Sequence, residues 1–268
     1  MSTQLDQQLQ ELLRETGRFI AEEFEKFSYD QVEYKGQNDP FTFVDVEAER
    51  RLRKGCEAII PHAGFITEEL ENSEGSNEYR WIIDPIDGTS NFTHGLPHFC
   101  TALALQKNEE TILGYVYQPI SGEMFQAELG AGASLNGKPI RKSERKDMNM
   151  ALASTGFPYA IGEWVQEYLE MVYDIMRRTH GLRRLGSAAL DLSYVASGRL
   201  DIYFETGLKP WDAAAGSLIV QEAGGKVSDF RGGNNFIFGR QIVATNAYVH
   251  EELLELIGQS KVLARINE

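Results

Sequence analysis

The run from Trp81 to Phe92 (Trp-Ile-Ile-Asp-Pro-Ile-Asp-Gly-Thr-Ser-Asn-Phe) constrains the fold more than any other segment of this chain. Its leading apolar residues predict a buried strand. The strand ends at Asp84, because the proline that follows disfavours a helical conformation in the residue before it. A second acid, Asp87, lies beside Gly88, which relaxes the turn, and the three small polar residues after the glycine are types that cap a helix or leave N–H groups free for an anion.

Two acids beside an anion-binding turn are expected where a metal cation lies between carboxylates and a phosphate. The same residues also have a plainer interpretation. Asp-Gly is a common turn dipeptide, and a strand followed by a polar turn needs no chemistry. The choice between the two depends on the rest of the chain.

Length and composition indicate an ordinary globular protein. The 268 residues are enough for one large domain or two intimately packed halves, and 42% hydrophobic with 25% charged residues excludes a disordered chain. No stretch approaches the roughly 18 apolar residues that span a membrane. The first eight residues have neither a basic nor an apolar region, so we expect no signal peptide and no membrane partner.

The cysteines and the charge restrict the compartment and the ligand. Cys56 and Cys100 lack metal-ligand spacing, which predicts buried free thiols in a reducing compartment and hence a cytoplasmic protein. A net charge of −14 argues against non-specific nucleic-acid binding. The charge could be a solubility feature spread over the surface. A phosphate-handling enzyme of this charge would instead need divalent cations among some of its acids, because a bound ion can be the largest charge in its site.

The apolar periodicity predicts a helix pair, then an antiparallel meander, then an α/β half. The expected elements of the first part are helices over 3–26 and 46–60 on either side of a loop over 34–44, and strands over 64–67, 79–84, 99–107, 112–117 and 123–127. After a basic, solvated connector over 141–146 we expect strand 150–154, helices 164–179 and 187–197, strand 201–204, helix 211–222, strand 242–245 and helix 248–257. This order predicts stacked α and β layers, with residues 1–145 and 146–268 as the two halves of one functional unit.

Several acids fall at the ends of expected elements. Asp45 begins a helix, Glu68 ends a strand, Glu205 ends a strand and Asp212 opens the next helix. Strand ends and helix N-termini tend to meet at one rim of a sheet, where like-charge repulsion would raise the carboxyl pKa values unless cations were bound. An all-oxygen ligand set favours Mg²⁺ over Zn²⁺. Each acid also has a plain alternative: Asp45 and Asp212 could be helix caps, Glu68 a solvated corner, and Glu205 an ion-pair partner of Lys209.

Three segments, in this order and spacing, resemble the inositol monophosphatase family: Gly64–Glu69, Trp81–Phe92 and Trp211–Gly225. The resemblance extends from the first helix to near residue 257. It implies a layered αβαβα sandwich, Mg²⁺-dependent hydrolysis of phosphomonoesters, inhibition by lithium and a homodimer.

The resemblance also implies roles for individual residues. Glu68, Asp84 and the carbonyl of Ile86 would bind the first Mg²⁺, Asp84, Asp87 and Asp212 the second, and Glu68 would share a weaker third ion. Thr89 and Asp45, together with Glu68, would form the catalytic group that orients and deprotonates the attacking water.

The residues that the resemblance assigns to the substrate are a further set. The N–H groups of Gly88 and Thr89 would hold the phosphate, with Asp87 and Asp212 beside it. The residues that match substrate-hydroxyl contacts in the family are Gly186, Ser187, Ala188 and Glu205, and Lys35 matches a basic residue near the metal-binding loop.

These assignments predict a phosphoric monoester hydrolase that acts on a small molecule, with inositol 1-phosphate as the first choice of substrate. A broad-specificity phosphatase for NADP(H) or fructose 1,6-bisphosphate is the alternative within enzymes. A regulatory binding protein that keeps the fold is the alternative outside them. A haloacid dehalogenase-type phosphatase does not fit, because Asp84 and Asp87 are three residues apart and no Asp-x-Asp follows the strand.

Overall fold

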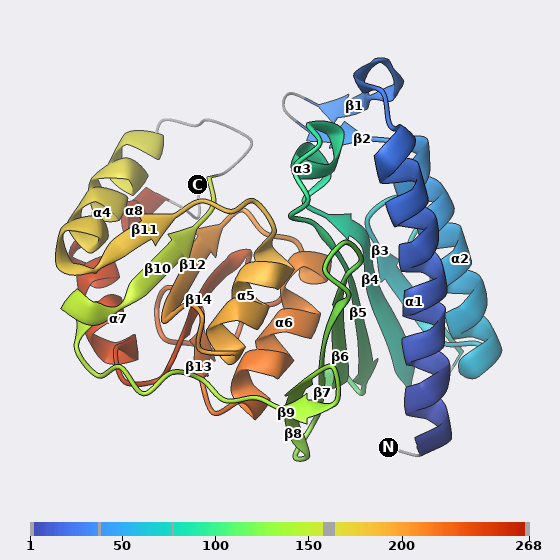
Figure 1. The fold of residues 1–268 in the computed structure, drawn as a ribbon. Coiled ribbons are helices and arrows are strands. Elements are labelled where there is room, and N and C mark those ends of the chain that lie inside the picture. Colours follow the sequence, from blue (N-terminus) through green and yellow to red (C-terminus); the bar gives the residue numbers. More distant parts are fainter. Residues whose placement is uncertain (1–2, 37–38, 77, 158–163, 266–268) are drawn as a thin grey trace.

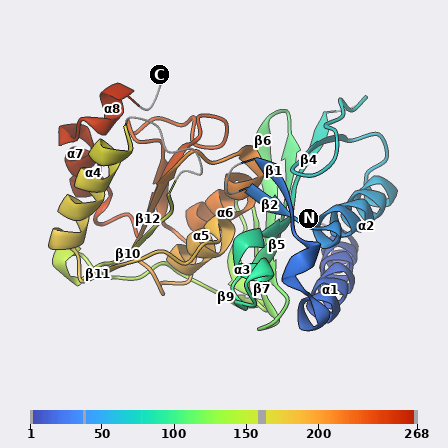
Figure 2. The same cartoon turned by 90° about the horizontal axis from the view of Figure 1, so that it is seen from above.

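The computed structural model of the protein describes residues 3–36, 39–76, 78–157 and 164–265 (Figure 1). Its elements stack as five layers, in the order helices, sheet, helices, sheet, helices, which confirms the predicted αβαβα sandwich. Helices α1 (Thr3–Lys26) and α2 (Phe43–Ile59) form one outer layer. Helices α5 (Ala188–Ala196) and α6 (Pro210–Glu222) lie between the sheets, and the other outer layer is formed by α4 (Val165–Arg178), α7 (His250–Gln259) and α8 (Val262–Arg265) (Figure 2).

The first sheet has the strand order β3-β4-β5-β6-β7-β8-β9. Its strands are β3 (Gly64–Thr67), β4 (Tyr79–Asp87), β5 (Cys100–Lys107), β6 (Glu110–Gln118), β7 (Glu123–Glu128), β8 (Gly132–Leu135) and β9 (Lys138–Pro139). Strand β3 is parallel to β4, and the remaining pairs form the predicted antiparallel meander.

Strand β4 continues beyond its predicted end at Asp84. Asp84 pairs with Ala102 and Asp87 pairs with Cys100, so two residues of β4 lie opposite the single residue Thr101. The proline there cannot donate to the neighbouring strand, and a bulge of this kind bends a strand and redirects its side chains. The bulge therefore separates the two acids of the motif without ending the strand.

The second sheet has the order β11-β10-β12-β14-β13. Its strands are β10 (Leu152–Thr155), β11 (Gly181–Arg183), β12 (Ile202–Thr206), β13 (Lys226–Ser228) and β14 (Gln241–Thr245). The sequence did not predict β11 or β13, each of which has three residues. A short helix α3 (Thr89–Thr93) follows β4, and short 3₁₀ turns are η1 (Tyr29–Gln31) and η2 (Met148–Met150).

Some predicted boundaries were wrong. The segment expected as a loop over 34–44 contains the hairpin of β1 (Glu33–Gly36) and β2 (Asp39–Phe41). Helix α2 begins at Phe43 rather than at Val46, because the Thr42 side chain caps it and accepts from the N–H of Val44. Helix α7 continues through Gly258 to Gln259.

The central helix α6 is apolar on all sides because it is covered by both sheets. Every residue from Ala213 to Val220 is buried, and its small side chains allow a close approach to β6. A Cβ atom on Gly114 would lie 2.7 Å from the carbonyl oxygen of Ala215. The core around α5 and α6 includes side chains from both sheets, so the two predicted halves share one hydrophobic core; their division at residues 145 and 146 stays a prediction.

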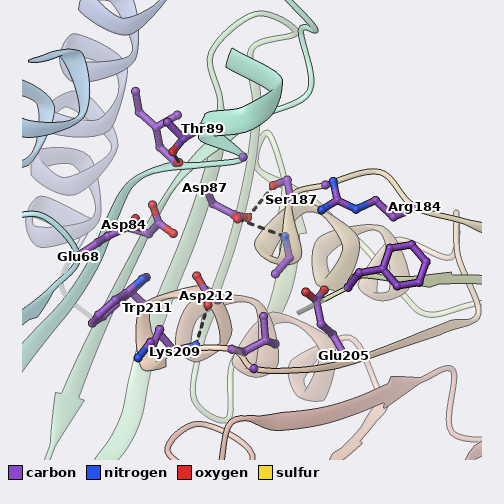
Figure 3. A pocket seen from close by; sticks show the side chains of 18 of the residues that line it. Glu68, Asp84, Asp87, Thr89, Arg184, Ser187, Glu205, Lys209, Trp211 and Asp212 are labelled. Atoms are coloured by element: carbon purple, nitrogen blue, oxygen red, sulfur yellow. Dashed lines mark hydrogen bonds between the residues drawn. The ribbon is translucent and has the colours of Figure 1, made fainter. Parts of the chain in front are cut away.

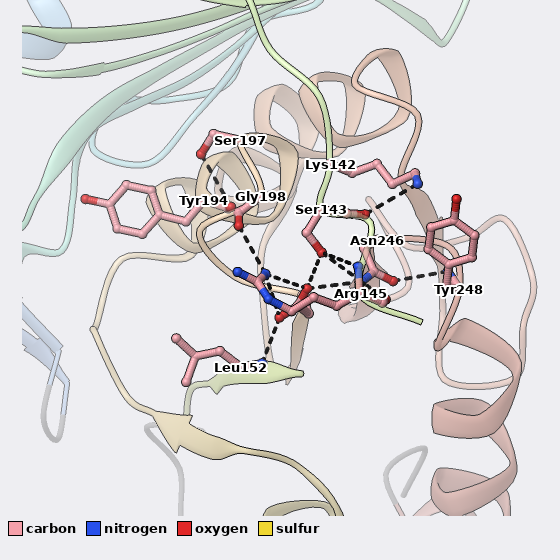
Figure 4. A network of polar contacts seen from close by, with 10 residues as sticks. Lys142, Ser143, Arg145, Leu152, Tyr194, Ser197, Gly198, Asn246 and Tyr248 are labelled. Atoms are coloured by element: carbon pink, nitrogen blue, oxygen red, sulfur yellow. Dashed lines mark hydrogen bonds and ion pairs between the residues drawn. The ribbon is translucent and has the colours of Figure 1, made fainter. Parts of the chain in front are cut away.

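The basic connector over 141–146 is mostly exposed, as predicted, but it is also anchored through Ser143 and Arg145. The fully buried Asp201 carboxylate accepts from the Ser143 hydroxyl, from Arg145 Nη1 at 3.1 Å and from the N–H of Leu152 at 2.8 Å. Asn246 Nδ2 also donates to Asp201, at 3.1 Å (Figure 4). These bonds hold the connector against the first strand of the second half.

Among the described helices, none combines the length and apolarity that a membrane crossing requires.

Candidate active site

A cavity of about 310 Å³ opens where the carboxyl end of β4 meets the N-termini of α3, α5 and α6 (Figure 3). Both halves of the chain line it. The predicted site residues among its lining are Glu68, Asp84, Ile86, Asp87, Gly88, Thr89, Gly186, Ser187, Ala188, Glu205 and Asp212. The structure thus brings together segments more than a hundred positions apart in the sequence.

The acids at the centre of the cavity form a cluster. Asp84, Asp87 and Asp212 each offer one carboxylate oxygen, and these atoms all lie within 4.8 Å of one another. Asp84 and Asp87 come from the two sides of the β4 bulge, and Asp212 comes from the first turn of α6. Glu68 reaches the same cavity because it directly follows β3, whose last residue pairs with the residue before Asp84.

The electrostatics of the cluster are unfavourable without a cation. Burial, and then the charge of Glu68, raises the pKa of Asp84 well above its usual range. Burial and the charge of Asp87 raise the pKa of Asp212 to about 8. Asp84 Oδ1 is buried and has no hydrogen-bond partner among the described residues. An unpartnered buried carboxylate oxygen within a set of oxygen donors fits a hard divalent cation such as Mg²⁺.

These raised pKa values predict that the metal-free protein loses stability as the pH rises. Because the folded pKa of Asp212 is about 8 against an ordinary 3.8, the folded state holds more protons than the unfolded state between these values. The free energy of unfolding therefore falls with rising pH, by about 3 kcal/mol or more between about pH 5 and about pH 8. Saturating Mg²⁺ should remove most of this slope, since the cation compensates the charge.

Denaturant unfolding at several pH values, with EDTA and with Mg²⁺, measures this effect. Equal slopes in the two series would contradict a cation site at the cluster. Ca²⁺, another hard cation with oxygen ligands, should act in the same direction as Mg²⁺, whereas an equal ionic strength of Na⁺ should not.

Asp87 is held by the N-terminus of α5. Its carboxylate accepts from the Ser187 hydroxyl at 2.6 Å, from the N–H of Ala189 at 2.7 Å and from the N–H of Ala188 at 3.3 Å. The Cys100 thiol lies 3.8 Å away and also donates to it. Burial raises the pKa of Asp87, and these hydrogen bonds oppose the shift. Ser187 and Ala188, predicted as substrate contacts, therefore line the cavity but direct these donors to Asp87; their contact with substrate stays a prediction.

The turn after β4 depends on a glycine. Gly88 has φ +100°, and a Cβ atom there would lie 3.1 Å from the carbonyl oxygens of both Gly186 and His98. Helix α3 starts directly after it, with Thr89 as its first residue. The turn thus packs against the backbone before α5, which brings the predicted phosphate turn and the predicted substrate segment together.

Thr89 and Asp45 lie side by side, as the resemblance to the family implies. Thr89 Oγ1 is 3.2 Å from Asp45 Oδ1 and 2.9 Å from the carbonyl oxygen of Ile86. The other oxygen of Asp45, Oδ2, accepts from the N–H of Thr42 at 2.8 Å and from the Thr42 hydroxyl at 2.6 Å. Asp45 therefore serves as a helix-capping residue through one oxygen and reaches Thr89 with the other. Burial raises its pKa to about 7.

Glu205 lies at the far end of the cavity. The Tyr203 hydroxyl donates to Glu205 Oε2 at 2.7 Å, and a Cβ atom on Gly156 would lie 2.1 Å from the carboxylate, so a side chain at this position would displace it. Burial raises the pKa of Glu205 to about 7, while the charge of Arg184 opposes the rise. The alternative ion pair with Lys209 is absent among the described contacts. The side chain of Lys35 lies outside the described part of the chain.

Sequence reasoning missed Arg184, which lines the cavity two residues before the predicted Gly186. A residue between a short, unpredicted strand and a helix gave no periodic signal. The one signal in the sequence was that a cationic residue, Arg184, lies two positions before Gly186, which the resemblance to the family had already assigned to the site.

A sequence model described as the inositol monophosphatase family matches residues 1–261. The chain belongs to the inositol monophosphatase family. Among curated relatives it is similar to Nus factor SuhB of Escherichia coli, with 42% identity over 242 residues, which cover 90% of this chain and 91% of the relative.

Solved structures of family members share the fold. The extragenic suppressor protein suhB of Bartonella henselae superposes with a TM-score of 0.91 at 35% identity and covers 96% of this chain and 99% of its own. The Thermotoga maritima IMPase superposes with a TM-score of 0.88 at 36% identity and covers 99% and 100% of the two chains. Family membership supports a phosphatase that uses an acidic metal site.

Proposed function

We propose that this protein is a Mg²⁺-dependent phosphomonoester hydrolase with inositol 1-phosphate as a substrate. The observation that carries the proposal is the cluster of Asp84, Asp87 and Asp212 oxygens within 4.8 Å of one another, in the cavity that the Gly88–Thr89 turn also lines. A phosphate placed at that turn would face the acids. It would bind there only with cations between them.

The metal ligands in this proposal are Glu68, Asp84, the carbonyl of Ile86, Asp87 and Asp212, for two or three Mg²⁺ ions. When bound, Mg²⁺ lowers the pKa of water and offsets the charge of the phosphate. The unpartnered Asp84 Oδ1 and the acid cluster support this ligand set.

The chain itself supplies the proton acceptor. An attacking water that donates to Thr89 Oγ1 allows the Thr89 hydroxyl to donate to Asp45 Oδ1, 3.2 Å away. With a pKa of about 7, Asp45 can act as a general base near neutral pH. The N–H groups of Gly88 and Thr89 hold the phosphate at the start of α3, and water attacks in line with the leaving alcohol. No covalent phosphoenzyme is needed.

The cavity favours a small polyol phosphate. Its volume of about 310 Å³ is at the lower end of the range of about 300–1,000 Å³ for ligand pockets, which is small for a dinucleotide such as NADP(H). Gly186, Ser187, Ala188 and Glu205 line the same cavity as the acids. We propose that the buried Glu205 carboxylate accepts hydrogen bonds from substrate hydroxyl groups there.

The name Nus factor, carried by relatives 42% identical to this chain, favours a second candidate function, a regulatory binding protein that keeps the fold. The intact set of acids and Thr89 supports turnover, since a binding protein does not require all of them. We also propose that the protein is a lithium-sensitive homodimer of the cytoplasm that binds neither nucleic acid nor membranes. The net charge of −14 supports the absence of nucleic-acid binding, and the buried free thiols support the cytoplasm.

A screen of phosphomonoesters with Mg²⁺, compared by kcat/KM, tests the proposal. We expect phosphate release from inositol 1-phosphate, its loss in EDTA, and much lower values for NADP. Absence of release from inositol 1-phosphate, fructose 1,6-bisphosphate and NADP alike would favour the regulatory protein instead.

A further inference from the structure

Arg184 places in the catalytic cavity a positive charge that the proposed reaction does not use. It lies between β11 and α5, its side chain lines the cavity, and Figure 3 shows it beyond Ser187 on the side away from Glu68 and Asp84. Within the described part of the chain, its guanidinium makes no hydrogen bond and no ion pair. The side chain is exposed in a protein with a net charge of −14, so its positive charge is accessible to an anionic ligand that enters the cavity.

The backbone around Arg184 is fixed relative to the phosphate turn. Asn91 of α3 donates from Nδ2 to the carbonyl oxygens of Leu185 at 2.8 Å and His98 at 2.7 Å. Gly186 has φ +91°, and a Cβ atom there would lie 2.6 Å from Arg184 Nη1, so the guanidinium lies over this glycine. Asn91 thus holds the backbone next to Arg184 against α3, the helix that begins at Thr89.

Two acids, Glu205 and Asp191, interact electrostatically with Arg184. Burial raises the pKa of Glu205 and the charge of Arg184 opposes this rise, but the hydrogen-bond donor to this carboxylate is the Tyr203 hydroxyl, at 2.7 Å. Burial also raises the pKa of Asp191, which is a buried residue of α5, and the charge of Arg184 again opposes the rise. Neither forms an ion pair with Arg184 within the described residues. The planar N–H donors of the guanidinium, which match a phosphate bidentately, are therefore available to a ligand.

We infer that Arg184 favours phosphorylated polyols that carry a second phosphate, such as sugar bisphosphates, over those that carry a single phosphate, such as inositol 1-phosphate. The inference rests on the proposed phosphatase function and assigns a specificity-determining residue to it. The scissile phosphate occupies the Gly88–Thr89 turn, substrate hydroxyl groups reach Glu205, and the second phosphate pairs with Arg184.

The test compares fructose 1,6-bisphosphate with inositol 1-phosphate in wild type, Arg184→Gln and Arg184→Lys. Arg183→Gln is the matched control, because Arg183 is exposed like Arg184, but its guanidinium donates to the carbonyl of Leu182 and does not line the cavity. We expect the ratio of kcat/KM for the bisphosphate to kcat/KM for the monophosphate to fall about 10-fold or more in Arg184→Gln, mainly through KM. Arg184→Lys should retain part of the ratio, and Arg183→Gln should retain all of it.

An unchanged ratio in Arg184→Gln, with inositol 1-phosphate still hydrolysed by wild type, would overturn the inference and leave the proposed function standing. If wild type hydrolyses neither compound, the proposed function fails. Calorimetric titration of fructose 1,6-bisphosphate into the Ca²⁺-loaded proteins then decides the inference: an affinity about 10-fold weaker in Arg184→Gln supports it, and equal affinities overturn it.

Discussion

Asp84→Asn is expected to abolish Mg²⁺-dependent phosphate release, with kcat/KM for inositol 1-phosphate reduced about 1,000-fold or more, since each bound cation supplies several kcal/mol of transition-state stabilisation. Asp84 is central to the cluster, because the charges of Glu68, Asp87 and Asp212 all act on it. Asparagine keeps the size of the side chain but offers a neutral ligand. The measurement is kcat/KM over a range of Mg²⁺ concentrations.

The variant should remain folded, and its metal-free form should be at least as stable as wild type, because the substitution removes a buried carboxylate beside other acids. Asp191→Asn is the matched control: Asp191 is equally buried but does not line the cavity, so wild-type turnover is expected. Near wild-type kinetics of Asp84→Asn would show that the acid cluster is not the metal site.

Thr89→Ala is expected to lower kcat about 100-fold while KM changes little. The Thr89 hydroxyl lies between Asp45 Oδ1 and the Ile86 carbonyl, so its loss interrupts proton transfer from water to Asp45, a kind of step that contributes about 10²–10⁴-fold. Steady-state kinetics with saturating Mg²⁺ separate the two constants.

Thr89→Ser is the matched control, because it keeps the hydroxyl and removes only a methyl group. It should retain most of the turnover. A Thr89→Ala enzyme with raised KM and undiminished kcat would assign Thr89 to substrate binding and leave Asp45 without its proposed partner.

The parts of the site that local sequence determines were predictable. The apolar residues before Asp-Pro predict a buried strand that carries Asp84, which lies at the bulge of β4, and Gly88 is needed for the left-handed turn that starts α3. The double role of Asp45 was predictable only as alternatives, capping residue or catalytic group. The structure shows that its two oxygens make both contacts, one with Thr42 and one with Thr89.

Other features depend on contacts between distant segments. Strands β11 and β13 have three residues each, too few for a periodic signal, and they form only because longer strands pair with them. The donors that hold Asp87 come from Ser187 and Ala189, about a hundred residues later. Arg184 becomes a candidate only once its position in the lining of the cavity is known. Such features could not be predicted from periodicity or spacing.

Calorimetric titration of Mg²⁺ into metal-free protein, with phosphate release from inositol 1-phosphate measured at the same Mg²⁺ concentrations, tests most directly whether Asp84, Asp87 and Asp212 bind the catalytic cation. Wild type should bind Mg²⁺ with release rising in step with occupancy, and Asp212→Asn should weaken both together. Phosphate release that is independent of Mg²⁺, or Mg²⁺ binding that is unchanged in Asp212→Asn, would contradict the assignment.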